Sequence, residues 1–165
     1  MVRSPADGIT IADLVRRIHL ASALIRRGSS ILLVASRYPN HAQPLWNLPG
    51  GRQLPRELLR DTVAREVLEE TGLSARIGEL LYLSESYDGD VHFTNCTFAA
   101  EVSGNIVAPR DDDHVAEARW VPLAQIAERL TVRVVREPLL AYLRGDLPLQ
   151  YAGYADADIS IVFPD

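Results

Sequence analysis

The fold is decided by the stretch GRQLPRELLRDTVAREVLEETGL, residues 51–73. Residues 57–70 have helical spacing at about 100° per residue. The apolar side chains then cover half of the circumference, which predicts a face packed on a sheet: Leu59, Val63, Ala64, Val67 and Leu68. Glu66, Glu69 and Glu70 share an adjoining arc, because spacings of three and four residues bring side chains together. Like charges weaken a helix there, so we expect an agent that offsets them, most simply a hard divalent cation.

The residues at both ends of this helix suit a ligand site. Gly50 and Gly51 allow the backbone to approach a ligand closely, and a carbonyl of that turn would complete an oxygen-only coordination shell. Glu57, at the predicted helix start, is expected either to cap free amides or to support the turn. Gly72 suits the left-handed conformation that ends a helix.

The bulk composition bounds the class of protein. The chain has 165 residues, of which 47% are hydrophobic and 24% charged, as in an ordinary globular domain. We therefore expect one domain over residues 1–165, with 1–17 and 145–165 as peripheral segments. The net charge of −5 argues against a nucleic-acid polymer as partner. A single cysteine, Cys96, excludes an internal disulfide and a cysteine-cluster metal site.

No membrane segment is predicted, because no stretch approaches the roughly 20 apolar residues that span a bilayer. Arg16 and Arg17 interrupt the apolar run near the N-terminus, so no signal peptide is expected either. The expected location is cytoplasmic.

The remaining pattern predicts strands around the central helix. Strands are expected at residues 18–25, 31–36, 46–48, 75–86, 91–102 and 117–121, with a further candidate at 159–163. Helices are expected at residues 123–130 and 132–143, and Pro138 should kink or split the second. Residues 9–15 fit either a short helix or an edge strand. This order predicts a mixed sheet covered by helices, with the central helix on one side.

The central stretch resembles the Nudix box, the signature of the Nudix hydrolases. That signature is Gly, five residues, Glu, seven residues, Arg-Glu, an aliphatic residue, any residue, Glu-Glu, any residue, Gly and an aliphatic residue. Every specified position is filled, by Gly51, Glu57, Arg65, Glu66, Val67, Glu69, Glu70, Gly72 and Leu73. Seven fixed positions match by chance about once in 10⁹ windows. Residues 46–50 and 118–122 extend the likeness over most of the domain.

The resemblance implies an α/β (α+β) fold, an α/β/α sandwich with a mixed central β-sheet. It implies hydrolysis of a pyrophosphate bond in a nucleoside diphosphate linked to another moiety, with Mg²⁺ or Mn²⁺. The implied metal ligands are Glu66, Glu69, Glu70 and the Gly50 carbonyl. Arg65 can reach Glu69 one turn on and hold it ionised in one rotamer. The general base is implied to be one of these glutamates or a loop residue.

One departure from the family pattern concerns the loop before the strand at residues 117–121. Many members carry a further glutamate there, whereas this loop reads Asp-Asp-Asp-His at residues 111–114. Asp113 is a candidate metal ligand in its place, and His114 is a candidate general base, since its ordinary pKa of about 6.5 suits the task. The alternative is a solvated acidic loop.

Substrate contacts are less marked in the sequence. Arg52 and Arg37 flank the proposed site and are candidates for binding phosphates, Gly51 for close backbone approach, and Trp46 for stacking on a base. The ligand class is a nucleotide, a nucleotide sugar or an ADP-ribose-like molecule. A non-catalytic nucleotide sensor or partner-binding domain on the same fold is the alternative. Family members often dimerise, so a homodimer is a further expectation.

Overall fold

The computed structural model describes residues 15–107 and 114–163. Its strands are β1 (Arg16–Arg27), β2 (Ser30–Ser36), β3 (Leu45–Asn47), β4 (Gly50–Arg52), β5 (Ser74–Asp88), β6 (Val91–Ser103), β7 (Val115–Pro122) and β8 (Tyr151–Tyr154). Its helices are α1 (Leu59–Thr71), α2 (Ile126–Arg129) and α3 (Arg133–Arg144), with 3₁₀ turns at Leu123–Gln125 and Pro148–Gln150. In the part of the chain that is described, no helix combines the length and apolar character needed to cross a membrane.

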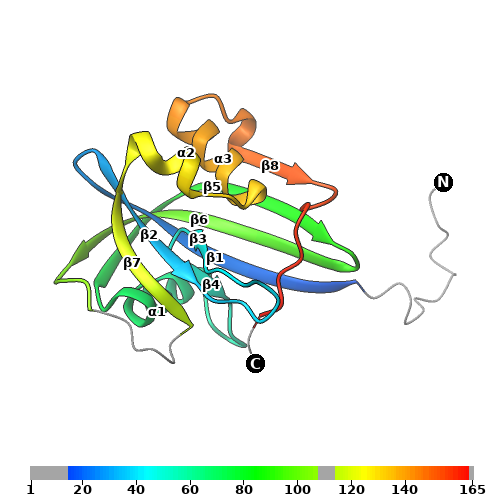
Figure 1. Ribbon diagram of the computed structural model, residues 1–165, viewed down its shortest axis with the longest axis horizontal. Coiled ribbons are helices and arrows are strands. Elements are labelled where there is room, and N and C mark those ends of the chain that lie inside the picture. Colours follow the sequence, from blue (N-terminus) through cyan, green and yellow to red (C-terminus); the bar gives the residue numbers. More distant parts are fainter. Residues whose placement is uncertain (1–14, 108–113, 164–165) are drawn as a thin grey trace, which may run out of the picture.

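Strand β1 connects the two halves of a mixed sheet. The strand order is β3-β2-β1-β6-β5-β8, with β4 added to β1 and β7 added to β2. β1 runs parallel to β6 from the pair Arg16↔Val91 to the pair Ile25↔Ala100. Its pairing with β2 covers only the hairpin end, at Arg26↔Ile31 and Arg27↔Ser30, so the two strands then diverge (Figure 1). The divergence leaves room for β4 beside β1.

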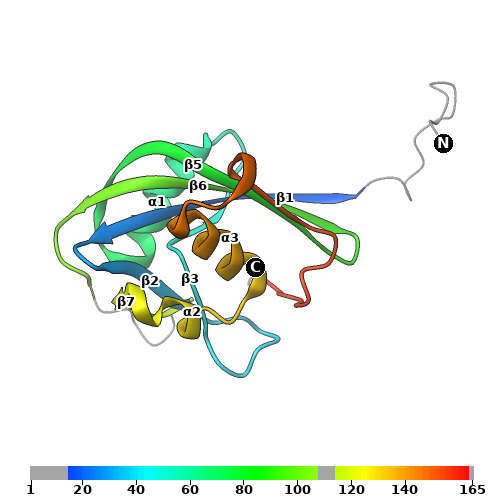
Figure 2. The same ribbon diagram turned by 90° about the horizontal axis from the view of Figure 1, so that it is seen from above.

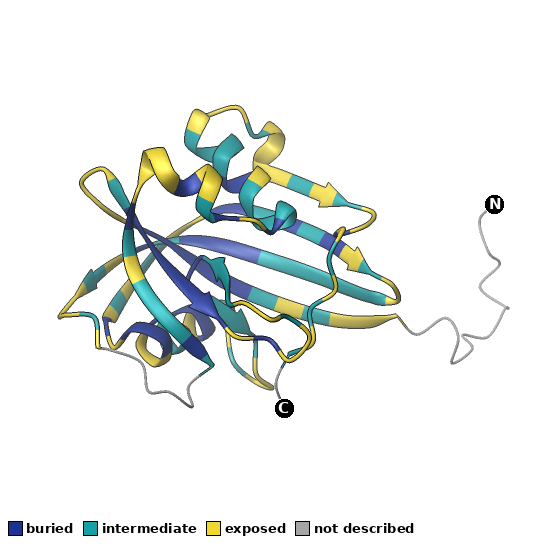
Figure 3. Cartoon of the chain, viewed as in Figure 1, coloured by how far each residue is buried: buried dark blue, intermediate teal, exposed yellow. Residues whose placement is uncertain are grey.

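Helices cover both faces of this sheet, as the α/β/α prediction requires. α1 lies on one side and α2 and α3 lie on the other (Figures 1 and 2). On β1, Ala21, Ala23 and Ile25 belong to the core under α1, whereas Leu24 belongs to the core under α2 and α3. This alternation follows from the two-residue period of a strand. The most buried residues accordingly run along the middle of β1, β2 and β6 (Figure 3).

Most of the strand and helix predictions are confirmed to within a few residues. Gly50–Arg52, which was expected to be only a turn, forms the short strand β4 against β1. The expected helix at 123–130 is divided into a 3₁₀ turn and the four-residue α2. Of the two outcomes expected at Pro138, a kink or a split, the split is not observed, because α3 continues through it as one helix. Pro138 and Leu139 are both buried, and their packing offsets the missing backbone hydrogen bond.

The predicted strand at residues 159–163 is wrong. Residues 159–163 are not assigned to a strand. The strand of this region is β8, which pairs in parallel with β5 from Leu83↔Tyr151 to Ser86↔Tyr154. β8 occupies the place beside the edge of β5. An apolar pattern alone does not make a strand, because a strand also needs a partner strand to pair with. Of residues 9–15, only Val15 is described, so the alternatives for that segment lie outside the described residues.

The end of α1 provides a stability test. Gly72 has φ 74°, and its N–H donates to the Leu68 carbonyl, as predicted for the end of the helix. A Cβ there would lie 2.5 Å from Val107 Cγ2, and the Val107 amide is held by the Thr71 carbonyl. We predict that Gly72→Ala lowers the free energy of unfolding by about 2–4 kcal/mol, from the left-handed conformation and the steric contact together. Urea denaturation measures this value.

Gly89 supplies the matched control. It also has a positive φ, of 54°, but no atom lies within 4 Å of an added Cβ. Gly89→Ala should therefore lose only about 1–2 kcal/mol. Equal losses in the two variants would contradict the contact with Val107.

Candidate metal centre

The centre begins at two glycines in β4. Gly50 has φ 156°, and a Cβ at this position would lie 2.3 Å from the Ala21 carbonyl oxygen of β1. A Cβ at Gly51 would lie 2.4 Å from Oε1 of Glu66. Any side chain at either position would therefore displace β1 or the Glu66 carboxylate. The glycine pair brings the carboxylate of α1 directly against the backbone of β4.

Two of the three clustered acids are withdrawn from solvent. Glu70 is 9% exposed, and its Oε2 accepts a hydrogen bond from the Gly50 N–H at 2.9 Å. Burial raises the pKa of Glu70 well above its ordinary value, and the charge of Glu66 raises it further. Burial also raises the pKa of Glu66, against the lowering effect of its hydrogen bond with Arg65. The charged form of both carboxyls is therefore less favourable than in water, and a positive charge beside them would favour it.

Arg65 is the cation that the chain itself supplies. Its Nε and Nη2 donate to the two oxygens of Glu57, at 2.8 and 3.1 Å. Nη1 donates to Oε1 of Glu66 at 2.8 Å and to Oε2 of Glu69 at 3.1 Å, and Nη2 also reaches the Arg52 carbonyl at 3.1 Å. The predicted contact between Arg65 and Glu69 is thus confirmed. One guanidinium orients two acids of the cluster and ties α1 to β4.

Glu57 supports the turn and does not cap the helix. Its Oε2 accepts hydrogen bonds from the Leu54 amide at 3.0 Å and the Thr62 hydroxyl at 2.8 Å. The N-cap residue of α1 is Leu58, which provides no side-chain cap. The paired hydrogen bonds from Arg65 are the main reason why the pKa of Glu57 is lowered to about 2. Of the two roles expected for Glu57, the structure shows the second.

The donor chemistry of the cluster fits a hard divalent cation, since carboxylate oxygens are what Mg²⁺ and Mn²⁺ prefer. Among the described residues, no three acidic, histidine or cysteine side chains are already gathered around one point. The side chain of Glu69 is 58% exposed, whereas those of Glu66 and Glu57 are 15% and 14% exposed. Glu69 is therefore the acid with the most freedom to turn toward a bound ion.

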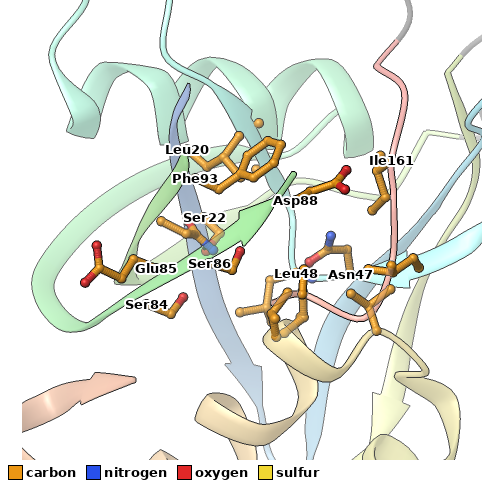
Figure 4. A pocket seen from close by; sticks show the side chains of 18 of the residues that line it. Leu20, Ser22, Asn47, Leu48, Ser84, Glu85, Ser86, Asp88, Phe93 and Ile161 are labelled. Carbon is orange, nitrogen blue, oxygen red and sulfur yellow. Dashed lines mark hydrogen bonds between the residues drawn. The ribbon is translucent and has the colours of Figure 1, made fainter. Parts of the chain in front are cut away.

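A cavity of about 110 Å³ adjoins Gly50 and Gly51 on the side away from α1. Figure 4 shows Ser22, Ser84 and Ser86 on one side of it and Asn47, Leu48 and Ile161 on the other. The Ser22 hydroxyl is 2.9 Å from the Thr97 hydroxyl and donates to Oδ1 of Asn95 at 3.3 Å. Two polar lining residues, Ser22 and Asn95, are thus held in place, within a lining that is mostly apolar and also includes Glu85 and Asp88.

Tyr38 is a residue of this site that the sequence did not indicate. It is buried at the cavity wall, and its pKa is raised to about 12, first by burial and then by the charge of Glu70. Its ring meets the ring of His114 edge to face, with centroids 5.1 Å apart. Nothing in the spacing marks Tyr38, which simply follows β2. It joins the end of the acidic loop to the carboxylate cluster.

His114 is half-buried against Tyr38, and burial lowers its pKa, which favours the neutral ring that a general base needs. Asp113 lies outside the described residues. The Arg52 guanidinium lies over the Phe163 ring, 5.1 Å from its centroid, at the cavity. Arg37 donates to the Val115 carbonyl at 3.3 Å, next to His114. The structure therefore brings His114 and Arg52 to the site.

Trp46 is placed differently from the base-stacking role proposed for it. It packs on the core under α2 and α3, and the guanidinium of Arg129 lies over its ring at 5.2 Å. It does not line the described cavity, whereas Phe93 does. Core packing therefore accounts for Trp46.

The comparison with known families identifies the fold. The NUDIX domain model matches residues 16–143, which is more than half of the chain. The chain belongs to the Nudix family. Its Nudix box is the stretch from β4 through α1 that holds the carboxylate cluster.

Relatives and solved structures agree with this membership. Phosphatase NudJ of Escherichia coli K12 is 28% identical over 139 residues, which are 82% of this chain and 90% of NudJ. The NUDIX hydrolase from Nitrosomonas europaea has a TM-score of 0.69 at 21% identity, covering 90% of this chain and 98% of that one. The MutT protein from Methanosarcina mazei Go1 has a TM-score of 0.67 at 26% identity, covering 79% and 96%.

Two other Nudix relatives are longer than the matched region. A Bacillus subtilis (strain 168) protein, named as a candidate 8-oxo-dGTP diphosphatase, is 38% identical over 82 residues, or 47% of this chain. MutT4 of Mycobacterium tuberculosis, named as a candidate mutator protein, is 27% identical over 161 residues, or 88% of this chain. The chain spans 50% and 64% of their lengths.

The ion pair inside the Nudix box predicts a pH-dependent stability. Because the folded-state pKa of Glu57 is about 2, against an ordinary value of 4.5, its carboxylate stabilises the fold fully above pH 4.5. This contribution is lost as the pH falls through 4.5 toward 2. We predict that Glu57→Gln lowers the free energy of unfolding by about 1–2 kcal/mol at pH 7, and that the difference from wild type shrinks as the pH is lowered.

Urea denaturation at several pH values measures that difference. Glu101→Gln is the control, since Glu101 and its partner Arg76 are both 76% exposed and such pairs contribute little. A loss for Glu57→Gln that is the same at pH 7 and at the acid end of the series would contradict the assigned ion pair.

Proposed function

We propose that the protein hydrolyses a pyrophosphate bond in a nucleoside diphosphate linked to another moiety, with Mg²⁺ or Mn²⁺. The observation that carries this proposal is the contact of the Glu66 carboxylate with Gly51, next to the buried Glu70 and at the edge of a cavity. The names of the relatives, which include a phosphatase and a candidate diphosphatase, support the same reaction class.

Glu66, Glu69, Glu70 and the Gly50 carbonyl would hold the cation. When bound, the cation supplies the positive charge that stabilises the developing charge on a phosphoryl oxygen and acidifies a water molecule. It would also offset the repulsion that raises the pKa values of Glu66 and Glu70.

The other residues position the reacting groups. Glu57 fixes Arg65, and Arg65 fixes the carboxylates of Glu66 and Glu69. Arg52 is the candidate phosphate ligand, because it follows Gly51 in β4 and its guanidinium lies over the ring of Phe163, which lines the cavity. An arrangement of this kind mainly contributes positioning and electrostatic stabilisation, which are what pyrophosphate cleavage requires.

The ligand is a small nucleotide derivative and not a nucleic-acid polymer. The net charge of −5 disfavours binding along a phosphate backbone, while a cation in the cluster would supply positive charge locally. A mostly apolar lining with a few polar groups, Ser22 and Asn95 among them, suits a nucleobase, and the lining acids Glu85 and Asp88 disfavour a second anionic group. Nucleoside di- and triphosphates, nucleotide sugars and ADP-ribose form the panel to assay.

The first test replaces single carboxylates without changing their size. We predict that Glu66→Gln and Glu69→Gln lower turnover of the preferred substrate by about 100-fold or more, because each removes a negatively charged metal ligand. Asp61→Asn on the exposed face of α1 is the matched control and should retain wild-type turnover. Release of phosphate or nucleoside monophosphate in the presence of Mg²⁺ or Mn²⁺ is the measurement.

Two results would overturn the proposal. Full turnover in both glutamine variants would show that the metal centre is not needed for the reaction. Tight nucleotide binding without turnover on the whole panel would indicate a sensor domain on a Nudix fold.

A second test concerns the general base. His114 and Asp113 are exchanged separately, as His114→Ala and Asp113→Asn. Loss of a general base lowers the turnover number by about 10²–10⁴-fold with little change in KM, which steady-state kinetics resolves. Wild-type turnover in both variants would show that this loop takes no part in the reaction. The general base would then be Glu66 or Glu69.

A further inference from the structure

The C-terminal segment lies across the cavity described above. In Figure 1 it is the red segment that leaves β8 and runs toward the β3–β4 end of the molecule. Along residues 157–163 the burial alternates: Ala157, Ile159, Ile161 and Phe163 line the cavity, whereas Asp158, Ser160 and Val162 are exposed. Residues 156–163 are called the C-terminal strap below.

Side chains, and not a strand ladder, hold this strap in place. Nδ2 of Asn40 donates to the Ser160 carbonyl at 2.7 Å, and Oδ1 of Asn40 accepts from the Val162 N–H at 3.0 Å. Nε2 of His41 lies 2.8 Å from the same Ser160 carbonyl oxygen. At the other end, the Ala157 N–H donates to the Tyr87 carbonyl at 2.8 Å. An ion pair between Arg133 and Asp158 adds to these bonds, and Ala157 is buried. The bonds at the Asn40 end are exposed, so this end of the strap can be released.

Phe163, the last residue of the strap, places an aromatic ring in the cavity wall. The ring of Phe163 lies 6.0 Å from those of Tyr38 and Phe93, and the Arg52 guanidinium covers it at 5.1 Å. Cation–π and edge-to-face contacts of this kind favour any aromatic ring, including a nucleobase. Phe163 thus occupies a place for which a substrate base has the right chemistry.

The space left beneath the strap is too small for a nucleoside. The cavity measures about 110 Å³, whereas sites for small molecules usually have about 300–1,000 Å³. A nucleotide can therefore enter fully only when part of the strap moves out.

We propose that the C-terminal strap is an intramolecular competitor of the substrate, that Phe163 holds the position of the substrate's base, and that Asn40 sets the strength of this competition. The proposal rests on the proposed function, because it concerns access to the same site. It makes the strap a determinant of specificity. A ligand with an aromatic base can replace the Phe163 ring against Arg52 and Tyr38, whereas inorganic pyrophosphate has no ring that could do so.

The test uses the full chain and the α,β-methylene analogues of ADP, GDP and UDP, which are not hydrolysed, with Mg²⁺ present. Asn40→Ala removes two hydrogen bonds from the strap, so the best analogue should bind about tenfold more tightly, since the competent fraction of molecules rises. Phe163→Ala should tighten binding in the same direction. Ser160→Ala is the control, because the Asn40 and His41 bonds use only the backbone carbonyl of Ser160, and its affinity should equal that of wild type.

Amide hydrogen exchange distinguishes a strap that is displaced by the ligand from a strap that remains a fixed part of the cavity wall. Ligands usually slow exchange, but here the analogue should accelerate exchange of the Val162 and Ala157 amides, because the strap is displaced. Asn40→Ala should accelerate exchange at Val162 even without ligand.

The outcomes separate this proposal from the proposed function. Weaker analogue binding in both Asn40→Ala and Phe163→Ala would show that the strap is part of the binding surface. Unchanged affinity, slower Val162 exchange on ligand addition, or no binding of any analogue would also overturn the proposal. If the protein shows no turnover but binds the analogue and releases the strap as predicted, the proposed hydrolase function is overturned. The proposal about the strap then stands.

Discussion

Arg65 shares one positive charge among three glutamates while a fourth lies close by. Glu57 takes two of its hydrogen bonds, and Glu66 and Glu69 take one each from the same Nη1. The buried Glu70 accepts a hydrogen bond from the Gly50 N–H instead. The opposite shifts of the pKa values follow, downward for Glu57 and upward for Glu70. Four glutamates surround one arginine here, so added positive charge would stabilise the centre.

The rest of the structure places this excess of negative charge next to the cavity. β1 carries α1 on one face and the cavity on the other, because its side chains alternate. β4 adds to β1 at Ala21↔Gly51 and Ser22↔Gly50, so the glycine turn stands between the carboxylates and the cavity. Ser22 on the cavity side and Ala21 on the α1 side are consecutive residues. A ligand in the cavity would therefore meet the carboxylate cluster across a single layer of backbone.

The sequence predicts the features of this site that depend on spacing within one helix. It does not predict those that depend on contacts between distant residues. The Arg65–Glu69 pair and the Gly72 helix end depend on spacings within one helix, so periodicity predicts them. Tyr38 and the strap depend on contacts between residues far apart; Asn40 and Ser160 are separated by 120 positions. Residues 159–163 have the apolar pattern of a strand, but β8 holds the place beside β5. Tertiary contacts decide which segment pairs with β5, and local propensity carries no information about those contacts.

The most direct measurement is the broadening of backbone amide NMR signals by substoichiometric Mn²⁺, with Mg²⁺ as competitor. A paramagnetic ion in the carboxylate cluster should first remove the signals of Gly50, Gly51 and the C-terminal half of α1, and excess Mg²⁺ should restore them. Retention of the Gly50 and Gly51 signals, while signals near exposed acids such as Asp156 and Asp158 disappear, would contradict the central claim that the crowded glutamates form a cation site.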